Sequence, residues 1–201
     1  MYNNLHWHSH IWIDLDETLA LTFWWMLAYA HSLGKLMQLR TLEDIIEHEI
    51  TSIPNIDITA HEMSHIWDTF SNTQEEREIP LMPLAKESIK KLCAQWKKLS
   101  IITARNEDKR KDSTIDYVHY HFGDIFEDRI FFVNHYSDSH KPKSEVCKEL
   151  GITLMIDDNE INALDLAYRD IECILIEKPW NKWKSIDHPY ITRVQGWHEI
   201  I

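Results

Sequence analysis

A short apolar run near the amino terminus ends in two carboxylates that are separated by one residue. Residues 11–13 are apolar, Asp14 and Asp16 follow them, and the hydroxyl of Thr18 comes two residues later. Such a run is typical of a buried strand in a parallel sheet, and ligands gather beyond the carboxyl ends of these strands. We therefore expect Asp14 at the edge of a crevice. A strand followed by a helix-capping turn would give the same local pattern, so the interpretation depends on the rest of the chain.

Three later segments also place polar side chains at the ends of predicted elements. They are a hydroxyl and a cation after an apolar run, two lysines at a helix start, and an acidic pair after another apolar run: Thr103, Arg105, Lys141, Lys143, Asp157 and Asp158. In this order the set resembles the four motifs of the haloacid dehalogenase superfamily of phosphohydrolases. The resemblance implies an α/β fold, a Rossmann-like parallel sheet covered by helices with a small inserted helical cap.

Composition limits the class of partner. A net charge of −12 over 201 residues repels polyanions, which argues against an extended nucleic-acid-binding surface and favours a small phosphorylated substrate. The three cysteines are well separated and lack metal-ligand spacing, so we expect neither a disulfide scaffold nor a structural zinc site, and the chain fits a cytoplasmic protein. The sequence leaves a homodimer open.

Residues 19–30 are almost entirely apolar and could be mistaken for a signal peptide. No Lys or Arg precedes Lys35, whereas a signal peptide begins with positive charge, and acidic residues come before the run. The run is also too short to span a bilayer. It predicts a buried helix, and no membrane partner is expected.

The segment that follows the first strand has a helical pattern. Thr59 with Glu62, and Ser71 with Gln74, have the spacing of a capping box. By the resemblance, residues 19–82 form a helical cap inserted into a core of residues 1–18 and 83–201.

Aromatic side chains are frequent in the first part of this insertion. Phe23, Trp24 and Trp25 lie in a helix that is apolar on every side, and such a helix must be covered all round or must cover something else. In a cap they would contact a planar substrate such as a nucleobase. The alternative is that they form the core of the cap itself.

From residue 83 onward, helices and strands alternate. The predicted helices include an amphipathic one carrying Ala85, Ile89, Leu92, Trp96 and Leu99, one from Asn106 to Gly123 with Ile115, Val118 and Phe122 facing inward, and short ones at residues 143–150 and 161–168. The predicted strands include residues 129–133 and 171–176. This alternation favours a parallel sheet with right-handed crossovers.

The motif residues suit phosphoryl transfer to a carboxylate. Asp14 is the predicted nucleophile, which forms an aspartyl-phosphate, and Asp16 is the predicted general acid and base. A Mg²⁺ ion needs hard oxygen ligands, and Asp14, the backbone carbonyl of Asp16, and Asp157 or Asp158 would provide them. Because halide leaves without a proton, the presence of Asp16 favours a phosphatase over a dehalogenase.

The remaining motif residues are predicted to contact the phosphate. Thr103 would donate a hydrogen bond, and a lysine would screen the nucleophile from the phosphate charge. Lys143 is preferred because it directly precedes a helix, whose positive end also favours an anion, and Lys141 is the second candidate. Arg105 would add a bidentate contact, or would be an ordinary solvated or capping residue.

In the second half of the chain, the resemblance is to one family within this superfamily. Residues 143–150, 177–181 and 193–200 resemble the 5'(3')-deoxyribonucleotidase family, which implies a nucleoside monophosphate as substrate. A departure is Glu17, at a position often occupied by Gly. Other readings are a phosphatase for another small ester or a nucleic-acid end, a phosphotransferase or mutase, and a binding module that lost turnover.

Overall fold

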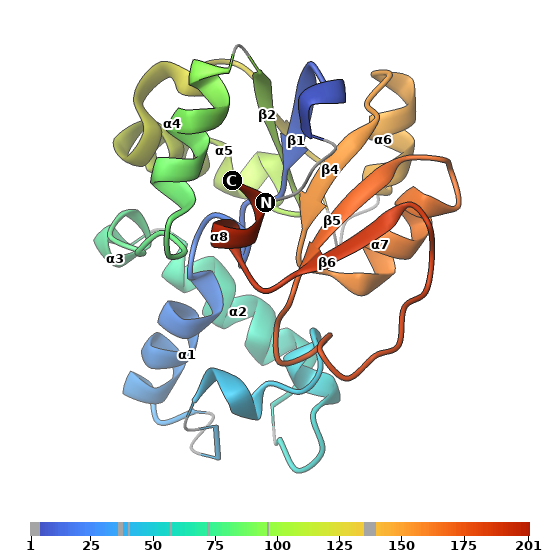
Figure 1. Cartoon of the computed structure of the whole chain (residues 1–201). Coiled ribbons are helices and arrows are strands. Elements are labelled where there is room, and N and C mark those ends of the chain that lie inside the picture. Colours follow the sequence, from blue (N-terminus) through green and yellow to red (C-terminus); the bar gives the residue numbers. More distant parts are fainter. Residues whose placement is uncertain are drawn as a thin grey trace.

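The computed structural model describes residues 5–35, 38–39, 41–56, 58–71, 73–95, 97–134 and 140–201 (Figure 1). Its centre is a six-stranded parallel sheet in the order β3-β2-β1-β4-β5-β6. The strands are β1 His10–Ile13, β2 Lys98–Thr103, β3 Ile130–Phe132, β4 Leu154–Asp157, β5 Glu172–Ile176 and β6 Ile191–Val194. The predicted α/β class and Rossmann-like sheet are confirmed.

Helices cover both faces of the sheet. They are α4 Ala85–Ala94, α5 Glu107–Phe122, α6 Lys143–Glu149, α7 Glu160–Ala167 and α8 Trp197–Ile200. Because side chains alternate along a strand, β1 sends Ile11 and Ile13 into a core that includes residues of α4, α5 and α8. It sends Trp12 into a second core that includes residues of α6 and α7. Burial on both faces explains why the central strands are continuous apolar runs.

The order of the strands places β1 at a switch point. The chain builds outward from β1 to β2 and β3 on one side and to β4, β5 and β6 on the other. Ile13 pairs with Ile156, and the amide of Asp14 donates to the carbonyl of Ile156 over 2.9 Å. Ligands bind at such reversals beyond the carboxyl ends of the strands, so Asp14 and Asp157 lie where a site is expected.

The insertion between β1 and α4 is helical in the part that the structure describes. It contains α1 Thr22–Ser32, α2 Ala60–Phe70, α3 Gln74–Arg77, and the 3₁₀ turns Leu42–Asp44 and Ile50–Ser52. Figure 1 shows α1 and α2 side by side beyond the carboxyl ends of the strands. The predicted capping box is present, since Thr59 and Glu62 exchange side-chain-to-backbone hydrogen bonds. The division into a cap and a core remains a prediction.

Several helix boundaries differ from those predicted. The helix expected from residue 19 begins at Thr22, because residues 15–20 form a hydrogen-bonded turn. It is not buried all round, since Trp24 is 43% exposed. Ser71 does not cap α3: it ends α2, and its hydroxyl donates to the carbonyl of Trp67.

In two further helices, the residues that face inward differ from those predicted. Ile115 of α5 is 40% exposed, whereas Val118 and Phe122 are buried as predicted. The amphipathic pattern expected to continue to Leu99 ends as a helix at Ala94, and Leu99 is a buried residue of β2. Trp96 lies outside the described residues.

Strand β6 was not among the predicted strands. It is an edge strand, and three of its four residues are only partly buried. It therefore lacks the apolar run that marks the central strands. No helix among the described residues is long and apolar enough to cross a membrane, and Cys93, Cys147 and Cys173 are free thiols.

Candidate active site

Three carboxylates meet at the carboxyl ends of β1 and β4. Asp14, Asp157 and Asp158 each offer an oxygen, and these oxygens lie within 4.8 Å of one another. All three side chains are buried. Two neighbouring parallel strands that both end in Asp place this acidic triad, as we call Asp14, Asp157 and Asp158, at one edge of the sheet.

Lys143, the first residue of α6, is the cation at the triad. Its Nζ donates to Asp14 Oδ1 over 2.6 Å and to Asp157 Oδ2 over 2.8 Å. Burial would lower the pKa of Lys143, but the two carboxylates outweigh burial and raise it. Lys141 instead lies at the surface, where its ammonium pairs with Glu149 at 2.6 Å. The structure thus brings Lys143, and not Lys141, to the triad.

The triad carries more negative charge than Lys143 balances. Burial raises the pKa of Asp14 to about 7, against the opposing effect of Lys143. Burial also raises the pKa of Asp158, and the neighbouring Asp157 and Asp14 raise it further. Three converging hard oxygen donors with one ammonium among them fit a divalent cation such as Mg²⁺, which prefers carboxylate ligands.

Asp16 belongs to a different cluster of charges. Arg105 donates to both of its carboxylate oxygens, from Nη2 to Oδ1 over 2.6 Å and from Nε to Oδ2 over 3.0 Å. Arg105 Nη1 also donates to Glu76 of α3 over 3.1 Å, and Arg110 Nη2 donates to the same Glu76 oxygen over 2.6 Å. We call Asp16, Glu76, Arg105 and Arg110 the arginine cluster.

This cluster determines the state of Asp16. Burial would raise the pKa of its carboxyl, but the Arg105 guanidinium lowers it well below the usual range. Thr22, the first residue of α1, donates a further hydrogen bond of 2.7 Å to Asp16 Oδ1. The phosphate contact predicted for Arg105 remains a prediction. In this structure its side chain is only 1% exposed and bonded to carboxylates, so it is neither solvated nor a simple cap.

The two threonines of the motifs are fully buried. Thr103, the last residue of β2, accepts a hydrogen bond of 3.2 Å from the amide of Arg105. Thr18 donates to Asp158 Oδ1 over 3.4 Å, and its carbonyl accepts from Trp197 Nε1 over 2.8 Å. Thr18 thus links the loop after β1 to the triad and to α8. The predicted phosphate contact of Thr103 is not tested by these bonds.

Residues after β5 support the triad, although they were not among the predicted site residues. Trp180 Nε1 donates to Asp158 Oδ2 over 3.2 Å. The side-chain amide of Asn181 donates from Nδ2 to the backbone carbonyls of Asp158 over 2.7 Å and Ile176 over 2.9 Å. The available signal was the position of this Trp-Asn pair shortly after a buried strand, where side chains reach the same edge of the sheet.

Glu17 has a backbone conformation that favours glycine. Its backbone φ is 60°, in the left-handed region that glycine adopts without steric cost. The side chain is buried and accepts a hydrogen bond of 2.6 Å from the amide of Phe23 in the first turn of α1. Its other oxygen lies 3.6 Å from Lys178 Nζ. Glu17 therefore ties the start of the insertion to the loop after β5.

The aromatic residues proposed as substrate contacts separate into different environments. The buried ring of Phe23 packs against those of Trp180, His48 and Trp67, at centroid distances of 5.2, 5.6 and 6.2 Å. Trp25 is partly buried and packs against the main core, and Trp24 is the most exposed of the three. Of the predicted set, Phe23 is thus the residue that contacts a neighbour of the triad, through Trp180.

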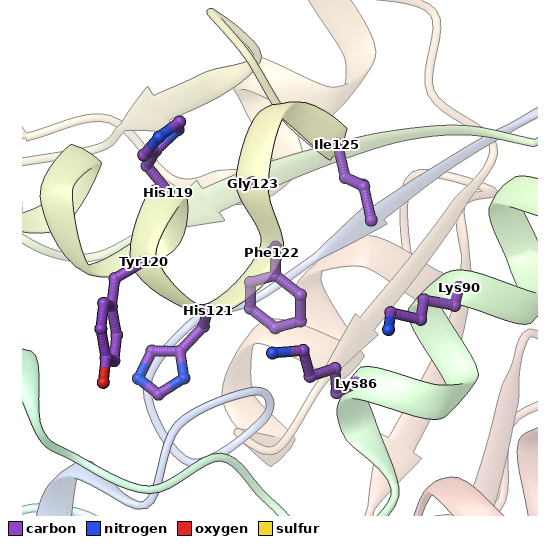
Figure 2. Close-up of a pocket in the computed structure, with 8 residues that line it drawn as sticks. All are labelled: Lys86, Lys90, His119, Tyr120, His121, Phe122, Gly123 and Ile125. Carbon is purple, nitrogen blue, oxygen red and sulfur yellow. The ribbon is translucent and has the colours of Figure 1, made fainter.

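A separate pocket of about 280 Å³ lies between α4 and the end of α5 (Figure 2). Lys86, Lys90, His121 and Phe122 are among its lining residues, and none of the motif residues is. The lysines lie beside the carboxyl end of α5, where cations stabilise the helix dipole.

Comparisons with known proteins place the fold. No protein-family model matches the chain, and no curated protein matches its sequence. Solved structures do match, among them a haloacid dehalogenase-like hydrolase from Bacteroides fragilis, with 16% identity, a TM-score of 0.68, and coverage of 96% of this chain and 100% of that one. A haloacid dehalogenase-like family hydrolase from Streptococcus pneumoniae has 15% identity and a TM-score of 0.63, with 96% of each chain covered.

CbbY from Rhodobacter sphaeroides, solved in complex with phosphate, has 15% identity and a TM-score of 0.55, with 96% of each chain covered. At these identities the likeness concerns the backbone. Together with the six-stranded parallel sheet, it shows that the chain has the fold of the haloacid dehalogenase-like hydrolases.

Proposed function

We propose that the protein is a Mg²⁺-dependent phosphomonoester hydrolase that works through an aspartyl-phosphate on Asp14. The observation that carries this proposal is the contact of buried Lys143 with Asp14 and Asp157 inside the acidic triad. A carboxylate can attack a phosphate ester only where cations neutralise the phosphoryl oxygens. The triad and Lys143 supply both the nucleophile and the means of neutralising that charge.

Asp14 is the nucleophile in this proposal. Its carboxylate attacks phosphorus, the ester oxygen leaves, and water later releases phosphate from the aspartyl group. Lys143 favours the ionised form of Asp14, which burial opposes. Thr103 and Lys143 would hold phosphoryl oxygens, and Thr18 and Trp180 fix the orientation of Asp158.

The residues that would hold Mg²⁺ are Asp14, Asp157 and Asp158, together with the backbone carbonyl of Asp16. The ion would supply positive charge that stabilises the phosphoryl oxygens as the bond to phosphorus forms. Little solvent reaches this site, because all three carboxylates are buried. Without a cation, the excess negative charge of the three carboxylates disfavours the state in which all three are ionised.

Asp16 is the general acid and base. Its pairing with Arg105 holds it as a carboxylate, which is the form that accepts a proton from water. To act as an acid it must first take up a proton from solvent, which requires its bonds to Arg105 to loosen, and it then passes that proton to the leaving oxygen. Glu76 of the insertion shares Arg105 with Asp16, so the position of the insertion can influence that step.

A nucleoside monophosphate is the proposed substrate, through the resemblance to deoxyribonucleotidases. The ring of Trp180, which bonds Asp158, and the ring of Phe23, which packs against Trp180, support a planar leaving group. A sugar phosphate is the second candidate, because CbbY, which shares this fold, has been solved with xylulose-(1,5)-bisphosphate.

The test is phosphate release from nucleoside and deoxynucleoside monophosphates, sugar phosphates and an aryl phosphate, with Mg²⁺ and with a chelator. Asp14→Asn is the control for the nucleophile. We expect release that requires both the metal and Asp14. Release by Asp14→Asn at the wild-type rate would refute the mechanism, and no release from any ester would favour a binding module. Transfer to an acceptor other than water would identify a phosphotransferase.

A further inference from the structure

We propose that His48 contacts the leaving group of the substrate and hydrogen-bonds an uncharged polar group on it. The proposal rests on the phosphomonoesterase function proposed above. It adds a specificity-determining residue from the insertion to a site whose charged residues come mainly from the sheet.

The ring of His48 lies one side chain away from the triad. It packs edge-on against Trp180 at a centroid distance of 6.0 Å and against Phe23 at 5.6 Å. Trp180 itself bonds Asp158. The titration of His48 also responds to the charges of Asp157 and Lys143, which places the imidazole within electrostatic range of both.

Ion pairs on the same segment hold His48 in this place. Glu43 Oε2 lies 2.6 Å from Lys182 Nζ, and Glu47 Oε2 lies 3.3 Å from Lys184 Nζ. Lys184 also pairs with Glu160, at the start of α7. The segment that precedes His48 is therefore fastened to the loop between β5 and β6, and Figure 1 shows these two parts of the chain near each other.

The imidazole has no hydrogen bond or ion pair with any residue that the structure describes. The side chain of His48 is only partly buried, and its ring nitrogens are not among the fully buried side-chain atoms that lack a partner. Phe23 and Trp180 contact the ring through their own rings, so the imidazole nitrogens are left to hydrogen-bond another group. A substrate group next to the triad would make that bond.

The chemistry of the ring defines what it can bind. Burial lowers the pKa of His48, and Lys143 adds to this, although Asp157, Glu160 and Glu49 act in the opposite direction. A neutral imidazole has one donor and one acceptor, which suit a hydroxyl, an amide or a ring nitrogen. The charged phosphoryl group is left to Lys143. The expected substrates are therefore phosphomonoesters with a polar but uncharged leaving group, large enough to reach His48.

The test compares substrates with large and small leaving groups. His48→Phe keeps the ring contacts and removes the hydrogen bond, whereas His48→Gln keeps a donor and an acceptor. His65→Phe is the matched control, because His65 lies exposed on α2. Steady-state kinetics are measured with the best nucleotide or sugar phosphate of the panel and with acetyl phosphate, whose leaving group is too short to reach His48.

We expect His48→Phe to lower kcat/KM for the large substrate about 10-fold or more, mainly through KM. The same variant should leave acetyl phosphate hydrolysis within about twofold, and His48→Gln should recover part of the loss. Equal losses on both substrates, or no loss on either, would overturn the inference while leaving the phosphatase proposal intact. If the wild type releases phosphate from no ester, the proposed function itself fails. Should His48→Phe not fold, His48→Leu, which also removes the hydrogen bond, decides with the same pair of substrates.

Discussion

The acidic triad and the arginine cluster are both buried groups of charges, but they differ in balance. In the triad, three carboxylates share the single ammonium of Lys143. In the arginine cluster, Asp16 and Glu76 face two guanidiniums, those of Arg105 and Arg110. In a balanced cluster the charges neutralise one another, and removing one partner leaves the others uncompensated, whereas an unbalanced cluster favours the binding of an additional cation. The comparison therefore distinguishes the arginine cluster, whose charges are balanced within the protein, from the acidic triad, whose charge favours a bound cation.

The largest expected effect on stability concerns the arginine cluster. Arg105→Met should lower the free energy of unfolding by about 3–5 kcal/mol, because it leaves the buried carboxylate of Glu76 and the partly buried carboxylate of Asp16 without their shared partner. Added Mg²⁺ should not restore this loss. Arg169→Met is the control, since Arg169 forms a partly exposed pair with Asp165 and its loss should cost less than about 1 kcal/mol. Urea unfolding of the three proteins measures the difference, and equal losses would refute the special role of Arg105.

Mg²⁺ should change the unfolding free energy through the acidic triad and not through the arginine cluster, by less than the loss expected for Arg105→Met. With free Mg²⁺ at 100 times its Kd, the unfolding free energy of the wild type should rise by about 2.7 kcal/mol. Asp158→Asn should lose most of this gain, because it removes a triad oxygen. Glu76→Gln should keep the gain, whatever its own stability. A gain that survives in Asp158→Asn would place the metal elsewhere.

The two clusters should also respond to pH with opposite sign. The folded pKa of Asp14 is raised from 3.8 to about 7, so its ionisation destabilises the fold as pH rises from about 4 to 7. The folded pKa of Asp16 is depressed, so its contribution is present above about pH 4 and is lost as pH falls further. In chelator, the Tm of the wild type relative to Asp14→Asn should therefore fall between pH 5 and pH 8. A constant difference would contradict the unbalanced triad.

The smallest expected effect concerns Lys141. Its pair with Glu149 is exposed and weakened by solvent, so Lys141→Met should leave both stability and phosphate release close to those of the wild type. Lys143→Met, the matched substitution two residues later, should abolish phosphate release. Phosphate assays on both variants test the assignment, and a reversed pattern would exchange the two lysines.

The sequence predicted those parts of the fold that depend on local pattern. β1, β2 and β4 are buried on both faces, so their apolar runs and polar ends were visible, and with them Asp14, Thr103 and the Asp157-Asp158 pair. Strand β6 was not predicted, because a partly exposed edge strand does not need an apolar run.

Contacts between distant segments were not predictable in the same way. The motif placed Arg105 near the site, but its partners Asp16 and Glu76 lie 89 and 29 residues away in the chain. His48 and Trp180 belong to the insertion and to a loop, where no periodicity marks a functional side chain. Only the folded chain shows that they meet beside Asp158.

The hydrogen bond from Trp197 to Thr18 spans 179 residues and has a consequence for synthesis on the ribosome. β1 is the first strand to be made, yet its neighbours β2 and β4 follow much later, and the loop that carries Asp16 and Thr18 gains the Trp197 bond last of all. The nascent chain thus holds an unpaired apolar strand until β2 has been made, a state that favours aggregation. The loop that carries Asp16 and Thr18 should therefore gain this bond only once Trp197 has left the exit tunnel.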